Sequence, residues 1–206
     1  MSRIPTPIVL CCSTALLLAT GCSIADGYRV PDGLTKHRSY TSIAGDVEVG
    51  RDASIRSART VAGNIEIHEG GRTGNLTTVA GRVRLGAKVR VEGSVKTVAG
   101  DIELDEGCTV TGDITTVVGH ITMAGGEIKG GVTLENGRLE IARTRVAGTV
   151  RVKHSDRDNA AIPELTIGPG AEVGALVVDE STEVRLRIHR TAKVGSIQGA
   201  EAEYYD

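Results

Sequence analysis

A short phrase recurs six times along the middle of this chain at a nearly constant spacing. Each copy has glycine as its fourth residue, followed by two apolar residues separated by one polar residue. The repeated glycines lie at intervals of 18, 18, 19, 19 and 18 residues, at Gly45, Gly63, Gly81, Gly100, Gly119 and Gly137. A fixed period of this length with alternating aliphatic residues predicts the stacked turns of a β-solenoid.

Alternation within one copy predicts which side chains face the interior, because successive side chains of a strand point to opposite faces. Later copies should then direct Ile102 and Ile121 into the core on successive coils. The chain has no Phe and no Trp, which fits a coil too narrow for large side chains. In the second copy we expect Val61, Gly63, Ile65 and Ile67 inside, and Thr60, Ala62, Asn64 and Glu66 outside.

The repeat continues beyond the six copies in a modified form. A charged segment, residues 153–163, ends in proline and predicts a loop that leaves the stack. Alternation then resumes, and the pair Leu165 and Ile167 recurs about 21 residues later as Leu186 and Ile188. The predicted fold is all-β: a single-domain parallel β-helix (β-solenoid) of about eight coils of 18–21 residues. We favour a right-handed helix, although the period does not set the hand.

The N-terminal segment, residues 1–21, has the features of a secretory signal peptide. Arg3 precedes an apolar run from Ile8 to Leu18, which is too short to span a membrane as a helix. The residues that follow, Ala19-Thr-Gly-Cys22, resemble a bacterial lipobox. This resemblance implies that Cys22 carries lipid as the mature N-terminus, and that Ser23, in place of aspartate, directs the protein to the outer membrane. A plain signal peptide cleaved elsewhere remains the alternative.

The segments that flank the repeats lack its periodicity. We expect residues 22–41 to form the lipidated N-terminus and a tether, residues 42–200 the solenoid, and residues 201–206 an acidic C-terminal tail. Solenoid ends expose core and strand edges that need covering. We therefore expect lids at both ends from the tyrosines, which all lie outside the repeats: Tyr28, Tyr40, Tyr204 and Tyr205.

Cysteine content and charge exclude several classes of protein. Cys11 and Cys12 belong to the predicted signal peptide and Cys22 to the lipid anchor, so only Cys108 remains and no internal disulfide can form. Cys108 is either a tolerated small residue at a coil corner or a reactive thiol. The formal net charge of −2 gives no support to a nucleic-acid partner.

The outward residues predict ladders of charge and no catalytic centre. With the coils in register, Arg84 should lie between Glu66 and Glu103, and Arg82 beside Asp101. The cluster from His154 to Asp158 is expected to be a loop, because adjacency in sequence does not orient a triad. We expect no enzyme, cofactor or metal site, since the histidines occupy unrelated phases of the repeat: His37, His68, His120, His154 and His189.

Three other functions of solenoid proteins fit this repeat poorly. A hexapeptide acyltransferase would need a small residue four positions after each aliphatic, where Val61 is followed by Ile65. A polysaccharide-cleaving β-helix would need long loops on several coils. An ice-binding face would need a second outward threonine where this chain has alanine, such as Ala62, so the threonine ladder is better explained as sheet stabilisation.

Phrases such as Thr97-Val-Ala-Gly-Asp-Ile-Glu-Leu104 resemble those of bactofilins, which are polymer-forming β-helical proteins, and of adhesin-like β-strand-repeat proteins. The resemblance covers Ile43 to about Val152. It implies self-assembly and a scaffolding role, although bactofilins are typically cytosolic and this chain carries an export signal. The expected function is a lipid-anchored, non-enzymatic structural or interaction module of the bacterial envelope, facing either side of the outer membrane. The alternative is a glycan- or peptidoglycan-binding, adhesin-like surface protein.

Overall fold

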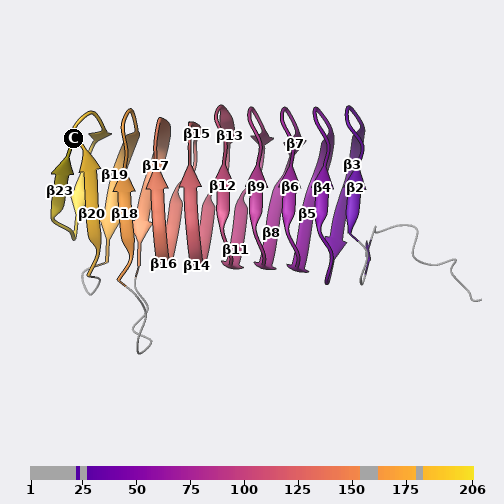
Figure 1. The fold of residues 1–206 in the computed structure, drawn as a ribbon, viewed down its shortest axis with the longest axis horizontal. Helices are drawn as coiled ribbons and strands as arrows, with labels where there is room; N and C mark the ends of the chain where they lie inside the picture. Colours follow the sequence, from indigo (N-terminus) through magenta and orange to yellow (C-terminus); the bar gives the residue numbers. More distant parts are fainter. Residues whose placement is uncertain (1–21, 24–26, 154–161, 180–182) are drawn as a thin grey trace, which may run out of the picture.

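The computed structural model describes residues 22–23, 27–153, 162–179 and 183–206. These residues form one parallel β-solenoid of about nine turns, drawn in Figure 1 as a row of stacked coils. The predicted all-β parallel β-helix is therefore confirmed. The described strands are β1 (Cys22–Ser23), β2 (Tyr28–Val30), β3 (Thr35–Ser42), β4 (Val47–Val49), β5 (Ser54–Ala62), β6 (Ile65–Ile67), β7 (Arg72–Thr73), β8 (Asn75–Ala80), β9 (Val83–Leu85), β10 (Arg90–Val91), β11 (Val95–Ala99), β12 (Ile102–Leu104), β13 (Cys108–Val110), β14 (Ile114–Met123), β15 (Gly126–Ile128), β16 (Val132–Ile141), β17 (Thr144–Val152), β18 (Glu164–Ile167), β19 (Glu172–Val178), β20 (Arg185–His189), β21 (Lys193–Val194), β22 (Ile197–Gln198) and β23 (Ala202–Tyr205).

Each coil pairs in register with the coils on either side of it. A typical coil contributes three strands, such as β6, β7 and β8, before the chain reaches the next coil at β9. Ile102 of β12 aligns with Val83 of β9 and Ile121 of β14, and both isoleucines are fully buried. The longer repeat is also confirmed, since Leu165 pairs with Leu186. Stacked aliphatic columns therefore form the core, as predicted.

The face assignment was wrong for the first residues of the repeated phrase. Thr60 is fully buried, whereas 45% of Val61 is exposed. Alternation holds only along an extended strand, and the chain turns a corner between Thr60 and Ile65. The threonine ladder therefore exists, but it lies inside the solenoid and the valines lie outside.

The corner glycines explain this inversion. Gly100 has a φ of 157°, a conformation that side chains disfavour, and the same region is used by Gly81 and Gly119. A Cβ added at Gly100 would lie 2.0 Å from the carbonyl oxygen of Gly81 in the preceding coil. Only glycine permits this approach, so the corner is turned at the same place in each of these coils.

The buried threonines hold the corners of adjacent coils together. Thr60 Oγ1 donates a hydrogen bond to the carbonyl oxygen of Gly45 at 3.2 Å, and Thr78 Oγ1 donates one to Gly63 at 3.2 Å. Thr116 makes the same bond to Gly100. The hydroxyl of Thr97 is buried without a hydrogen-bond partner within the part of the chain that the structure describes. The threonines thus satisfy corner carbonyls from inside the core.

The solenoid extends further toward both termini than the sequence indicated. Residues 28–42, expected to belong mainly to a tether, form β2 and β3, which pair with β4 and β5. The expected tail contributes β23, which pairs with β20. The sequence indicated a tether and a tail because these segments lack the repeat. A terminal coil has only one neighbour, so its sequence need not follow the repeat closely.

Tyrosines occupy both ends of the stack. Tyr28 and Tyr40 align with the inward positions of β4 and β5, and their rings lie 5.1 Å apart. Tyr205 packs edge-on against His189 at the other end, beneath the guanidinium of Arg187. Tyr204 aligns with the buried Ile188, yet 59% of it is exposed. The tyrosines therefore cover the core more completely at the N-terminal end, where Tyr40 is buried, than at the C-terminal end.

The buried and outward positions of β12 should respond very differently to substitution. We expect Ile102→Asp to unfold the stack, because an unpaired buried carboxylate costs several kcal/mol against a total stability of about 5 to 15 kcal/mol. Glu103→Ala removes only exposed contacts to Arg82 and Arg84 and should cost less than about 1 kcal/mol. Thermal unfolding followed by circular dichroism measures both; equal shifts would contradict the assigned faces.

The two kinds of buried threonine also give a matched test. Thr78→Val should destabilise the protein by about 1–2 kcal/mol, because it removes a hydrogen bond to the Gly63 carbonyl. Thr97→Val has the same shape change but removes a hydroxyl that has no partner among the described residues, so it should be neutral or stabilising. Urea denaturation of both variants checks this. Equal losses of stability would mean that the hydroxyl bond does not hold the corner.

Candidate functional site

Cys22, the predicted lipidation site, lies in the first layer of the stack. Its strand, β1, runs parallel to β3, with Cys22 aligned to Thr41 and Ser23 aligned to Ser42. The next coil continues this position with Arg59. A lipid on Cys22 would therefore place the membrane beside the first coil, with no long tether between them. Lipidation itself stays a prediction.

The outward charges pair between coils as the sequence indicated. Glu66, Arg84 and Glu103 align on successive strands. Arg82 Nη2 lies 3.8 Å from Asp101 Oδ2, and Arg84 Nε lies 4.0 Å from Glu103 Oε2. These side chains are half exposed or partly exposed, so each pair contributes no more than about 1 kcal/mol. Their arrangement favours one register over a slipped one.

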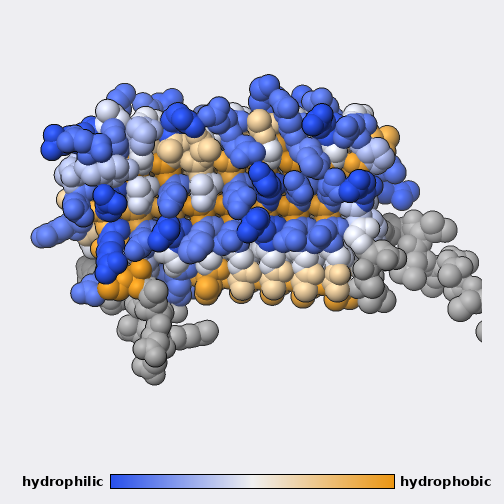
Figure 2. Space-filling model, viewed as in Figure 1, coloured by the Kyte–Doolittle hydropathy of each residue, from blue (hydrophilic) through white to orange (hydrophobic). Residues whose placement is uncertain are grey.

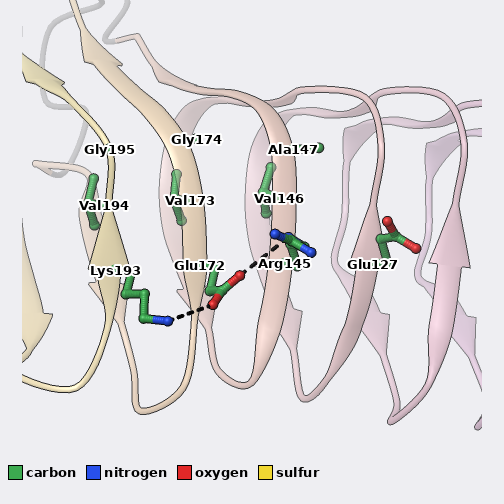
Figure 3. Close-up of a pocket in the computed structure, with 10 residues that line it drawn as sticks. All are labelled: Glu127, Arg145, Val146, Ala147, Glu172, Val173, Gly174, Lys193, Val194 and Gly195. Atoms are coloured by element: carbon green, nitrogen blue, oxygen red, sulfur yellow. Dashed lines mark hydrogen bonds and ion pairs between the residues drawn. The ribbon is translucent and has the colours of Figure 1, made fainter.

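A shallow hollow of about 670 Å³ lies across β17, β19 and β21 near the C-terminal end (Figure 3). At its centre Glu172 Oε1 accepts a hydrogen bond from Lys193 Nζ at 3.1 Å, and Arg145 Nε lies 3.3 Å from Glu172 Oε2. The hydrogen bond and charge of Lys193, with the charge of Arg145, lower the pKa of Glu172. The carboxylate is held ionised between two cations, an arrangement suited to holding coils together.

The histidines that the structure describes lie on separate parts of the rod. His68 Nε2 lies 3.1 Å from Glu48 Oε1, and His189 Nδ1 lies 2.8 Å from Thr191 Oγ1. His154 and the rest of the predicted loop cluster, through Asp158, lie outside the described residues. Across the described ranges, no group of three His, Cys, Asp or Glu side chains could hold a metal ion.

Cys108 points into the core at the start of β13. Its Sγ lies 3.1 Å from the carbonyl oxygen of Gly86 and is almost fully buried. Burial raises the pKa of this thiol to about 11. The thiolate, which is the reactive form, is therefore suppressed at neutral pH. Of the two sequence interpretations, the geometry favours a small core residue.

One surface feature escaped the sequence analysis. The corners that turn Ser42 and the threonines inward expose apolar residues that follow them, and Figure 2 shows the resulting apolar row along the lower edge of the rod. We call this row the valine edge: Ile43, Ala44, Val61, Ala62, Val79, Ala80, Val98, Ala99 and Val118. A signal was present, because two consecutive apolar residues before a glycine cannot both face the core of an extended strand.

The reactivity of Cys108 should depend on folding. Burial raises the pKa of this thiol from its ordinary value of 9.0 to about 11, so the thiolate fraction at pH 8 falls about 100-fold before access is considered. In a chain carrying Cys22→Ser and lacking residues 1–21, labelling by a disulfide reagent should be at least that much slower than in denaturant. Rapid labelling of the folded protein would contradict a core position for this thiol.

No family model, curated protein or solved structure matches this chain. Within the described ranges the structure also has no helix with the length and apolar character needed to cross a membrane.

Proposed function

We propose that this protein is a rigid, non-enzymatic structural or scaffolding module of the bacterial cell envelope, held to the outer membrane by lipid on Cys22. The observation that carries the proposal is the continuous register, since all 23 described strands belong to one hydrogen-bonded sheet. Nine coils at about 4.8 Å per coil make a rod about 40 Å long. A rigid rod of this kind is suited to holding other envelope components at a fixed distance from one another.

The outward side chains support a structural role. Charged residues such as Arg82, Glu103 and Glu172 bind their counterparts on neighbouring coils. Groups used in this way hold the register, and they are not free to polarise a substrate.

The lipid anchor is tested by Cys22→Ser. We expect this variant to remain unprocessed or to appear in the soluble fraction, because the thiol is the only lipid attachment point that the lipobox provides. Membrane fractionation with detergent extraction gives the measurement. A mature Cys22→Ser protein that still fractionates with the outer membrane would overturn the anchor.

Self-assembly at the C-terminal end is the second part of the proposal. The last coil leaves Val194, Ile197 and Tyr204 only partly covered, with Tyr204 aligned to the core position of Ile188. A stack that ends on core positions can accept another coil from a second copy. Association through this end would extend the rod.

Sedimentation of the delipidated protein at increasing concentration tests the assembly. We expect concentration-dependent polymers, and we expect Tyr204→Glu to reduce them because it places a charge on the open end. Gln198→Glu adds the same charge at an outward position of the last coil and should leave assembly unchanged. A strict monomer at all concentrations would reject the scaffold and favour recognition.

The competing proposal is glycan or peptidoglycan binding. A polar groove of about 560 Å³ near the N-terminal end favours it, because Arg56 and Arg72 line the groove with His37 and Glu92. Cation and carboxylate side chains around an open groove suit hydroxyl and carboxylate groups of a glycan. Arg72→Ala should then abolish pull-down with purified peptidoglycan while leaving the fold unchanged; retained pull-down would exclude this groove.

A further inference from the structure

The valine edge is long, continuous and confined to one half of the rod. Between 42 and 52% of each large apolar residue of the edge is exposed, on five successive coils: Ile43, Val61, Val79, Val98 and Val118. The row stops at the next coil, where Glu135 and Asn136 follow Leu134 in place of valine and alanine. The row is contiguous over five coils, whereas exposed apolar residues are ordinarily scattered singly.

The two flanks of the edge differ in charge: the flank after the corner glycines carries both signs, with Asp46, Arg82 and Asp101, and the flank before the edge is basic. The outward column beside it contains Thr41, Arg59, Thr77, Lys96 and Thr115, with no acidic residue. No side-chain ion pair involves Arg59 or Lys96 among the described residues. Residues 27–100 carry twelve Lys and Arg against seven Asp and Glu, whereas residues 101–206 carry eleven against eighteen. The apolar edge and the excess of positive charge therefore occupy the same half.

The predicted anchor lies in this same place. The backbone of Cys22 aligns with Thr41, the first residue of the basic column, and so lies two coils before Arg59. Its sequence continuation, Ser23-Ile24-Ala25, repeats Ser42-Ile43-Ala44, the residues at which the edge begins. The predicted attachment point thus lies one coil before the coil at which the valine edge begins.

A second copy of the chain is a poor occupant for this surface. Five coils at about 4.8 Å spacing give a row about 20 Å long and about 10 Å wide, or roughly 200 Å² on each partner. A stable interface buries about 800 Å² on each partner. Two copies anchored in one membrane would also bring their basic columns together, which opposes pairing.

We propose that the valine edge rests on an anionic lipid bilayer, so that the rod lies along the membrane over its first five coils. This inference rests on the proposed lipidation of Cys22. The lipid supplies the affinity, and a small apolar edge flanked by Arg59 and Lys96 then has only to orient the rod. Apolar residues enter the headgroup boundary while the cations meet lipid phosphates, as in other interfacial surfaces.

Neutron reflectometry measures this orientation directly. The full lipidated protein is inserted into supported bilayers of phosphatidylethanolamine and phosphatidylglycerol, and the thickness of the protein layer is recorded. A rod lying flat gives a layer of about 20 Å, the span of a face of about six residues, whereas an upright rod gives about 40 Å. We expect the thin layer; a 40 Å layer for the wild-type protein overturns the proposal.

Matched variants test whether the edge causes the orientation. Val61→Glu with Val98→Glu places two carboxylates on the edge, two coils apart, and should raise the layer toward about 40 Å. Thr111→Glu with Gln198→Glu adds the same charge at exposed positions elsewhere and should keep the layer thin. If the edge variant does not fold, Val61→Thr, Val79→Thr and Val98→Thr keep the branched shape and should also thicken the layer. Equal thickness for edge and control variants overturns the proposal.

The anchor and the edge fail in different ways. An upright wild-type rod that Cys22→Ser releases from vesicles leaves the anchor standing and removes the edge proposal. Cys22→Ser protein that still binds these vesicles, and loses binding when Val61 and Val98 become Glu, supports the edge and removes the anchor. Sedimentation velocity in detergent tests whether a second copy of the chain binds the edge instead. If the wild-type protein is a dimer and the edge variant is a monomer, the edge is an interface between copies and the proposal is overturned.

Discussion

The structure depends on the close approach of successive coils at the glycine corner. There the backbone of one coil lies so near the carbonyl of the coil before it that no Cβ fits, as Gly100 and Gly81 show. The inward threonine hydroxyl bonds to the exposed carbonyl, for example Thr78 to Gly63. Because this contact recurs at the same place, it sets the register of the aliphatic columns inside and of the charged columns outside.

The sequence was sufficient to predict what depends on spacing alone. The glycine interval gave the solenoid, and the alternation after each glycine correctly placed Ile102 and Ile121 in the core. The charge ladder of Glu66, Arg84 and Glu103 was also correct, since register follows once the period is known. These features need no knowledge of dihedral angles.

What could not be predicted depends on conformation at particular residues. Thr60 and Val61 exchanged faces because Gly63 and its counterparts turn the chain between two extended segments, and alternation does not carry through a turn. The terminal coils around Tyr28 and Tyr205 were missed because each has a neighbour on one side only. The valine edge was missed because alternation, which does not carry through the glycine corner, had placed its valines inside. Cys22 was proposed from sequence, and what the structure adds is its alignment with Thr41.

The repetition of one local contact has a consequence for how this molecule can vary in size. Each interior coil meets its neighbours through the same glycine corner and the same aliphatic columns, so the coil from Ile65 to Arg82 could be followed by a duplicate of itself without a new kind of contact. Length can therefore change in whole steps of about 4.8 Å while cross-section and surface columns stay the same. The length of such a solenoid is therefore set by the number of its coils.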